Sequence, residues 1–474
     1  MHPTLVILAV GLTARLIGAH TPHLRGLAAG GGRRNLAALL PAVTCSMQAT
    51  FTTGLTPRDH GIVGNGWLFR DLMEILFWRQ SNRLVGGEPV WEAARRRDPS
   101  FTCANLFWWF NMAASHDVGV TPRPRYKADG RKLPDIYTKP SELRDELQAE
   151  LGTFPLFQFW GPGAAIRSTR WIADATRHVM GRRQPTLTLC YLPHLDYDLQ
   201  RFGPDPARPE VARALADLDA VVGDLLAAAG DRRVLVLSEY GLTPVSRPVA
   251  INRRLREAGL LAVRDEDGGE LLDPIASRAF AVADHQVAHL YLAADVDPET
   301  VRGLVAALPG VEAVLGPREK RAAGLDHPNA GDLVAVAQAD AWFTYYYWLD
   351  DSRAPDFART VEIHRKPGYD PAELFLDPRL RLPKAAIAGR LLRRRLGFRT
   401  MMDVIPLDPG LVRGSHGRPT DRAEDGPVLL SSVPHLLGDE ETLPATAVKG
   451  LILDHLFSDA APARRRALRE VAAP

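Results

Sequence analysis

The chain has 474 residues, of which 46% are hydrophobic and 24% charged, so it is long enough for a large buried core of ordinary globular composition. Its formal net charge of +2 is too small to indicate nucleic-acid binding. The three cysteines, Cys45, Cys103 and Cys190, form no CxxC pair, which argues against a disulfide framework and against a structural zinc site.

The N-terminal apolar segment, residues 5–10, is predicted to be a buried strand. It is short, and it lacks the basic start and small-residue cleavage site of a signal peptide. No stretch of the sequence reaches the roughly 18 apolar residues that a membrane span needs. We therefore expect a cytoplasmic protein without a membrane span.

Short apolar runs alternate with helical patterns along the chain. Residues 186–192 and 234–238 are further strand candidates, and between them residues 208–230 place apolar side chains on one helical face: Val211, Leu215, Leu218, Val222, Leu225 and Leu226. Together these segments outline a βαβ unit, whose connection should be right-handed. The sequence thus predicts an α/β fold with a mostly parallel central sheet and helices on both faces.

Polar residues follow the predicted strands. Thr44 follows the apolar segment 36–43, Asp196 follows residues 186–192, and Glu239 follows residues 234–238. Active residues of open α/β sheets gather at the carboxyl ends of strands, so these three side chains are candidates for one site. Taken alone, each of these residues is more readily an ordinary polar loop residue, and Thr44 can also be a helix cap.

Two regions differ in character from the rest. Residues 67–140 are rich in aromatic and arginine side chains, and residues 244–399 include TYYYW and a basic stretch at 390–399. We expect a single domain over residues 1–474 in which these two regions are insertions that cap the active edge of the sheet. The arginine run at 464–466 is interpreted as a solvated helix face.

The most specific signal is the segment at residues 41–67, which reads PAVTCSMQATFTTGLTPRDHGIVGNGW. It resembles the nucleophile segment of type I phosphodiesterases and nucleotide pyrophosphatases, a branch of the alkaline phosphatase superfamily. The resemblance implies that Thr44 is a catalytic nucleophile at a helix N-terminus and that Asn65 helps to hold a phosphoryl oxygen. Helix N-termini attract phosphate because of their free N–H groups and positive dipole end, which agrees with this role.

Three later segments extend the resemblance, which covers roughly residues 4–420. Asp196 matches a family Asp that binds the first of two metals, and His416 matches a C-terminal His that joins it. The family's second His is here Gln200. At the second metal, the early Asp is here Val10, and an adjacent Asp-His pair is here Glu239-Tyr240.

These replacements alter the expected metal centre. The family site holds two metals, usually zinc, about 4 Å apart. The resemblance leaves Asp196, His416, Glu239 and Gln200 as metal-ligand candidates, with one divalent ion rather than two as an open alternative. Oxygen donors suit Mg²⁺ or Mn²⁺ better than they suit Zn²⁺.

Substitute ligands are available elsewhere in the sequence. Asp198 lies beside Asp196, and His285 and His289 lie four residues apart, with Asp284 next to them. In the segment IHRKPGYDP, residues 363–371, His364 and Lys366 are candidates for contact with an anionic substrate.

The leading hypothesis is a metal-dependent hydrolase of phosphodiester, diphosphate or phosphomonoester bonds in a small molecule, acting through Thr44. The alternative is a non-catalytic protein that keeps the phosphate cradle and has lost its metal centre. A third reading is transfer of another group, such as sulfate, because Cys45 adjoins Thr44 and sulfatases use a modified Cys; the full segment matches the Thr-using branch better. Substrate identity, oligomeric state and partner proteins are left open.

Overall fold

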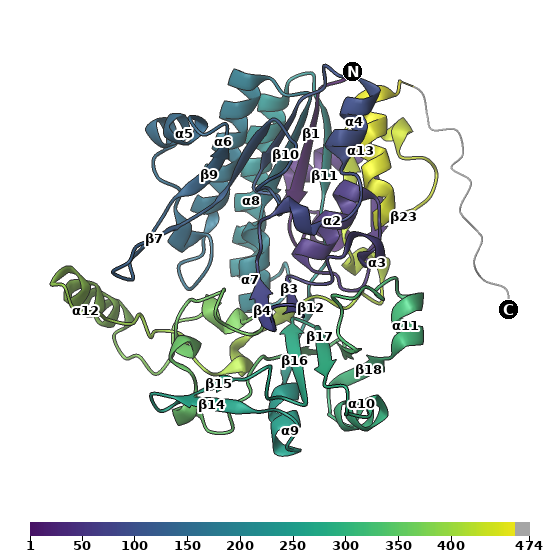
Figure 1. Ribbon diagram of the computed structural model, residues 1–474. Coiled ribbons are helices and arrows are strands. Elements are labelled where there is room, and N and C mark those ends of the chain that lie inside the picture. The colour runs from purple at the N-terminus through teal and green to yellow at the C-terminus, as the bar shows by residue number, and fades with distance from the viewer. Residues whose placement is uncertain (460–474) are drawn as a thin grey trace.

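The computed structural model describes residues 1–459, so the arginine run at 464–466 lies outside the described residues. Its main feature is a nine-stranded sheet (Figure 1). From one edge to the other the strands are β23 (Thr442–Pro444), β2 (Arg33–Ala37), β22 (Val428–Ser431), β11 (Arg233–Leu237), β1 (Thr4–Ala9), β10 (Leu187–Leu192), β5 (Cys103–Leu106), β6 (Val118–Pro122) and β9 (Ile136–Lys139).

The centre of this sheet is parallel. β1 pairs in parallel with both β10 and β11, so that Ile7 lies opposite Cys190 and Val236. β5 and β6 continue the parallel arrangement, whereas β22 and β9 run antiparallel to their neighbours. The α/β fold with a mostly parallel sheet, expected from the sequence, is confirmed.

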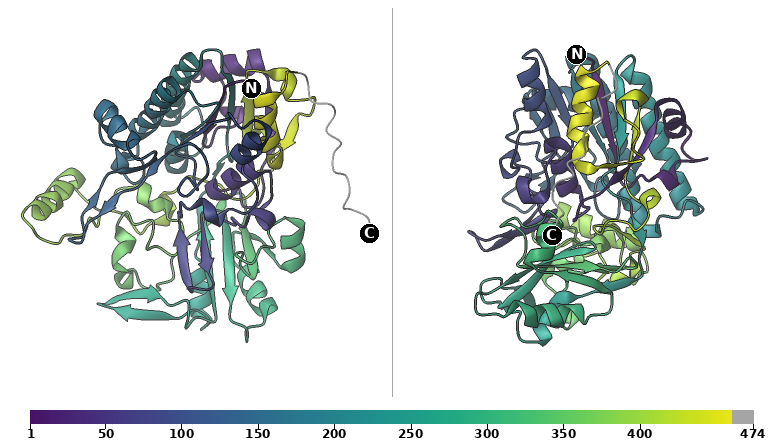
Figure 2. Two further views of the ribbon diagram at one scale, coloured as in Figure 1. Left: turned by 45° about the horizontal axis from the view of Figure 1, so that its top comes forward. Right: turned by 90° about the vertical axis from the view of Figure 1, so that its right-hand side faces the viewer.

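Helices cover both faces of the sheet, as the right-hand view of Figure 2 shows. One layer contains α1 (Pro22–Gly31), α6 (Ile166–Arg183), α7 (His194–Phe202) and α8 (Pro209–Ala229), with α5 (Leu143–Leu151) outside α6. The other contains α2 (Thr44–Thr53), α4 (Val90–Arg97) and α13 (Val448–Phe457), with the short α3 (Pro57–His60) after α2. No helix of residues 1–459 is both long and apolar enough to cross a bilayer.

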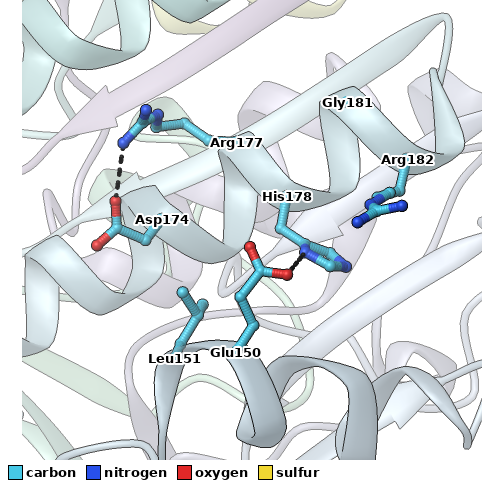
Figure 3. A pocket seen from close by; sticks show the side chains of 7 residues that line it. All are labelled: Glu150, Leu151, Asp174, Arg177, His178, Gly181 and Arg182. Atoms are coloured by element: carbon cyan, nitrogen blue, oxygen red, sulfur yellow. Dashed lines mark hydrogen bonds and ion pairs between the residues drawn. The ribbon is translucent and has the colours of Figure 1, made fainter.

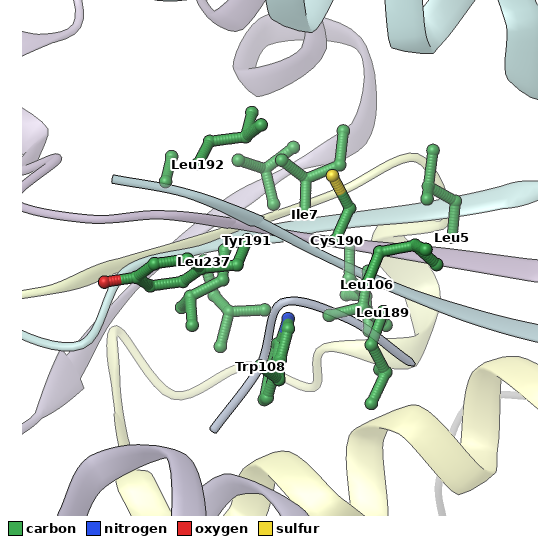
Figure 4. Packing of buried hydrophobic residues seen from close by; sticks show 14 of the residues in the cluster. Leu5, Ile7, Leu106, Trp108, Leu189, Cys190, Tyr191, Leu192 and Leu237 are labelled. Carbon is green, nitrogen blue, oxygen red and sulfur yellow. The ribbon is translucent and has the colours of Figure 1, made fainter. Parts of the chain in front are cut away.

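The strand sequences explain why the sheet is buried on both faces. Along β10, Leu189 and Tyr191 point to one face and Cys190 and Leu192 to the other (Figure 4). All six residues of β10 are buried, as are all six of β1. A continuous apolar run is typical of a parallel strand that packs against helices on both sides.

A second layer lies beyond the carboxyl ends of the central strands, in the lower half of Figure 1. Its antiparallel sheet has the order β16 (Ala279–Asp284), β17 (Val287–Leu292), β19 (Leu333–Ala337) and β18 (Val311–Leu315). It carries α9 (Ile251–Glu257), α10 (Pro298–Ala306) and α11 (Pro317–Ala322). This layer has its own hydrophobic core, formed largely by residues of the expected 244–399 insertion.

The region expected as the first insertion, residues 67–140, is divided between the two layers. The hairpin of β3 (Gly66–Phe69) and β4 (Glu74–Phe77) contacts β16, whereas β5, β6 and β9 belong to the main sheet. Smaller pairs complete the fold: β7 (Arg125–Tyr126) with β8 (Lys132–Leu133), β12 (Thr243–Pro244) with β21 (Gly414–Ser415), β13 (Arg247–Val249) with β20 (Ala341–Phe343), and β14 (Val263–Glu266) with β15 (Gly269–Leu272).

Candidate functional site

Thr44 begins helix α2, with Val43 as the N-cap residue. The next backbone N–H, that of Cys45, donates to the Asn65 side-chain oxygen at 3.0 Å. The Asn65 side-chain amide and backbone N–H both donate to Asp284, at 3.1 and 2.7 Å. Asn65 is therefore fixed at the start of α2 by a carboxyl group from the end of β16.

The central strands bring three further candidates to Thr44. Asp196 lies in α7 directly after β10, and Glu239 and Tyr240 follow β11. The Tyr240 hydroxyl lies 3.3 Å from Thr44 Oγ1 and donates to Asp196 Oδ1, also at 3.3 Å. A phenol thus links the threonine hydroxyl to a carboxyl group.

Gln200 extends this chain of hydrogen bonds. Its amide donates to Asp196 Oδ2 at 2.7 Å, and its Oε1 accepts from the Tyr369 hydroxyl at 3.0 Å. Gln48, one turn after Thr44 on α2, donates to Glu239 Oε1 at 2.5 Å. Every side chain in this network is buried, including Thr44, which is 4% exposed.

Four aromatic rings stack beside the network. Tyr240 lies on His416 with ring centroids 3.5 Å apart, His416 lies 3.8 Å from His285, and His285 lies 3.6 Å from Tyr369. The two phenols at the ends of this column are the same ones that hydrogen-bond Asp196 and Gln200. The column and the hydrogen bonds therefore form one tightly packed cluster, in which Glu239 Oε2, His285 Nε2 and His416 Nε2 have no hydrogen-bond partner among the described residues.

Burial sets the charge of the cluster. It raises the pKa of Asp196 to about 7 and that of Asp284 to about 6, and it raises the pKa of Glu239 well above its usual value. Burial also lowers the pKa of both His285 and His416 well below the ordinary imidazole value. The imidazoles are therefore neutral at pH 7, and burial favours the protonated form of Glu239.

Other predicted residues lie away from Thr44. Asp198 pairs with Arg201 at 3.0 Å, because two residues along α7 turn it about 200° from Asp196. His289 contacts the Val63 carbonyl at 2.9 Å and accepts from the Gly331 N–H at 3.1 Å. It is separated from His285 because His285 lies in the turn of a β-hairpin, whereas His289 lies further along β17, opposite Val282.

The two residues expected to meet substrate are likewise engaged elsewhere. The Lys366 ammonium is buried and lies 2.7 Å from both Asp370 and Glu373. His364 is partly buried, which lowers its pKa. The structure brings neither side chain to the Thr44 cluster.

Tyr240, Tyr369 and Gln48 take part in the cluster although the sequence did not assign them a role. Tyr240 stands at a position where the family has a metal ligand, and here it hydrogen-bonds Thr44 and Asp196 instead. Gln48 could have been found from its spacing, because a residue four after Thr44 shares its helical face. Tyr369 lies in the segment 363–371 but carries no signal of its own.

Two hollows lie outside the cluster. A small recess of about 10 Å³ beside Tyr369 is lined by Trp78, Trp160 and Lys366, among others. A hollow of about 590 Å³ lies between α5 and α6, where His178 pairs with Glu150 at 2.8 Å (Figure 3). The latter contains none of the residues that surround Thr44.

A family model described as type I phosphodiesterase / nucleotide pyrophosphatase matches residues 4–370. The chain belongs to this family. An uncharacterized pyrophosphatase/phosphodiesterase of Schizosaccharomyces pombe is 26% identical over 249 residues, which cover 48% of this chain and 41% of that protein. The match therefore spans less than half the length of that relative.

Solved structures with a similar fold align with nearly the whole chain. Phosphonoacetate hydrolase from Sinorhizobium meliloti 1021, in complex with phosphonoformate, has a TM-score of 0.60 at 13% identity and covers 96% of each chain. An inactive variant of murine ectonucleotide pyrophosphatase / phosphodiesterase 5, in complex with AMP, has a TM-score of 0.59 at 15% identity, with 98% of this chain and 96% of that chain covered. These likenesses show the alkaline-phosphatase-like fold.

The residues of this family member do not fit a two-metal centre. Asp196 Oδ1 and His416 Nε2 lie 3.8 Å apart, but Gln200 and Tyr240 are hydrogen-bonding groups and Val10 is an apolar residue at the end of β1. Within residues 1–459, no group of three or more His, Cys, Asp or Glu side chains is arranged to hold a metal ion. Within the described residues, the divalent ion implied by the resemblance therefore lacks a full set of donors: of its expected ligands, Asp196 and His416 lie side by side, whereas Gln200 and Tyr240 are engaged in hydrogen bonds.

Proposed function

We propose that this protein hydrolyses a phosphate ester, diphosphate or phosphonate bond of a small molecule, with Thr44 as the nucleophile. The observation that carries the proposal is the hydrogen-bonded chain from Thr44 Oγ1 through the Tyr240 hydroxyl to Asp196 Oδ1. Family membership and the position of Thr44 at the start of α2 support it.

In the proposed first step, Thr44 Oγ attacks phosphorus and the bond to the leaving oxygen or carbon breaks. The threonine proton passes to the Tyr240 oxygen while the phenolic proton of Tyr240 passes to Asp196. A carboxyl whose pKa is about 7 suits this role, because a base near the working pH combines availability with driving force. The leaving group takes a proton from solvent as it departs, and Asp196 returns its proton to solvent. Water then attacks the phospho-threonine, its oxygen bonds to phosphorus, and its proton passes to the Thr44 oxygen as that P–O bond breaks. No step is routed through the family's two metals, because the family's ligands are replaced at Val10, Gln200, Glu239 and Tyr240.

The raised pKa of Glu239 favours an anionic substrate near Thr44. The buried carboxyl accepts from Gln48, and its pKa is well above the usual value, so it does not repel a phosphate as a carboxylate would. The relatives with bound AMP and phosphonoformate suggest a small phosphorus oxyanion as the ligand class.

The enclosure of the cluster favours a second candidate function. Thr44, Asp196 and Tyr240 are each at most 8% exposed. A substrate must therefore displace some of the surrounding side chains before its phosphorus can contact Thr44 Oγ1. A protein that binds a phosphate ligand at the rim without turning it over would have the same fold and the same buried network. This is the non-catalytic alternative.

Assay of the wild type against phosphomonoesters, phosphodiesters, diphosphates and phosphonates decides between them. The assay is run with chelator and with added Zn²⁺, Mg²⁺ or Mn²⁺. We expect turnover that falls at least about 1000-fold in Thr44→Ala, with phosphate trapped on Thr44 in acid-quenched wild type. Thr52→Ala is the matched control, because the Thr52 hydroxyl bonds the Gln48 carbonyl in the same helix. Ligand binding without turnover in any condition would favour the non-catalytic alternative.

A further inference from the structure

Helix α12 (Pro383–Arg395) stands off the body of the protein. In Figure 1 and in the left view of Figure 2 it projects at the periphery, away from both sheets. Its packing against the rest is limited: Ile387 is partly buried against the small cluster that contains Val404 and Ile405. Arg390 pairs with Asp403 at 2.6 Å, and the Arg394 side chain donates to the Thr400 carbonyl at 2.7 Å, so these contacts define the inward side of the helix.

The remaining surface of this segment is unusually apolar. Of the twelve large hydrophobic side chains exposed within residues 1–459, six lie between residues 382 and 401, each at least 50% exposed: Leu382, Leu391, Leu392, Leu396, Phe398 and Met401. Single exposed hydrophobics are normal, but their concentration on one projecting element marks an interaction surface.

The same segment is strongly basic. Residues 380–402 contain seven Lys or Arg residues and no Asp or Glu. Within the described part of the chain, the side chains of Lys384, Arg393, Arg395 and Arg399 have no ion pair or hydrogen bond, in contrast to Arg390 and Arg394. Free cations therefore surround the exposed leucines, which favours a partner that is both anionic and apolar.

We propose that the α12 surface, residues 381–401, docks the protein on an anionic lipid bilayer surface. The helix, about 20 Å long, would lie in the plane of the interface with its leucines among the acyl-chain ends and its arginines at the lipid phosphates. Long arginine side chains allow this arrangement, because they can extend from a buried stem to a charged layer.

The shape of the surface favours lipid over an acidic protein. Leu391 and Leu392 are consecutive and so point about 100° apart around the helix, and Phe398 and Met401 lie beyond its end. These side chains stand out from a convex element rather than lining a groove. A bilayer adapts to such a surface, whereas a protein partner would need a matching cavity for each.

Vesicle co-sedimentation tests the proposal on the whole protein. The probes are phosphatidylcholine vesicles with and without phosphatidylglycerol, at low and high salt. We expect binding to the mixed vesicles only, weakened by salt. Each free arginine near an anionic surface changes partitioning about fivefold, so Arg393→Ser, Arg395→Ser and Arg399→Ser together should weaken binding roughly 100-fold. A second variant with Leu392→Ser and Leu396→Ser should also lose binding while keeping the charge.

Matched controls replace exposed residues elsewhere. Arg182→Ser on α6 and Ile275→Ser, a residue 77% exposed, should bind vesicles as the wild type does. All variants change exposed side chains, and unchanged thermal unfolding will show that they fold. Failure of the wild type to bind anionic vesicles, equal binding to phosphatidylcholine alone, or equal binding by both α12 variants would overturn the proposal. Capture on poly-glutamate without vesicle binding would also overturn it and indicate an acidic protein partner.

Discussion

Replacing Asp196 by Asn should make the protein more stable at alkaline pH than the wild type. Asp196 is buried beside Tyr240, Gln200 and the ring column, and burial raises its pKa from 3.8 to about 7. Asparagine has the same shape and no charge. Its amide can keep the hydrogen bond from Tyr240, and Gln200 can rotate its own amide to accept from the new NH₂ group.

The sign and size follow from proton binding. Between pH 4 and 7 the folded wild type holds a proton on Asp196 that the unfolded chain has released, so its free energy of unfolding falls as pH rises. The variant has no such proton to lose. A pKa raised from 3.8 to about 7 corresponds to about 4 kcal/mol, so the stability of Asp196→Asn relative to wild type should rise by about that amount from pH 4 to above pH 7. The pKa of Asp284 is also raised, but Asp284 is present in both proteins, so its contribution cancels in the difference between them.

Urea unfolding of both proteins at several pH values between 4 and 8 measures this difference. The slope with pH is the decisive quantity, because any constant cost of the substitution drops out of it. If the difference in stability between the two proteins does not depend on pH, the pKa of the buried Asp196 carboxyl is not raised, and the reasoning is refuted. A variant that becomes relatively less stable at pH 8 would show that the wild-type carboxylate has a cationic partner, as a metal ligand would.

Three further substitutions test the network and its surroundings. Tyr240→Phe removes only the hydroxyl between Thr44 and Asp196, so turnover should fall about 100-fold in steady-state assays. Thermal unfolding should change little, because the ring still stacks on His416. Unchanged turnover would exclude proton transfer from Thr44 through Tyr240 to Asp196. Val10→Asp, which restores the family residue, should lower the free energy of unfolding by several kcal/mol, since the position is fully buried among apolar residues, and a neutral effect would indicate an unrecognised cation there. Lys366→Met should cost about 3–5 kcal/mol because it leaves two buried carboxyls without their cation. Arg365→Met, which loses an exposed ion pair and a contact with the Phe357 ring, should cost about 1 kcal/mol, and equal costs would contradict the structural role of Lys366.

The sequence could predict the parts of the site that follow strands. Thr44, Asp196 and Glu239 each come just after an apolar segment, and the carboxyl ends of parallel strands meet at one edge. The parallel sheet itself follows from continuous apolar runs such as β10, which need cover on both faces.

The rest depends on contacts that no local pattern encodes. Asp284 reaches Asn65 from 219 residues further along the chain, and Tyr369 reaches Gln200 across 169 residues. Periodicity within the second layer does not say which of its side chains meet the main sheet. His285 and His289 illustrate this, because their four-residue spacing suggested proximity, whereas the β-hairpin places them at different points along it.

Metal content measured together with turnover tests the central claim, that Thr44 acts within a cluster in which several of the family's metal ligands have been replaced, at Val10, Gln200 and Tyr240. The protein is purified without chelator, its bound metals are counted by elemental analysis, and the phosphoester panel is repeated after exhaustive chelation. The account predicts less than one metal ion per chain, turnover that survives chelation, and loss of turnover in Thr44→Ala. Two tightly bound metal ions per chain, with turnover lost on their removal and restored on their return, would contradict it.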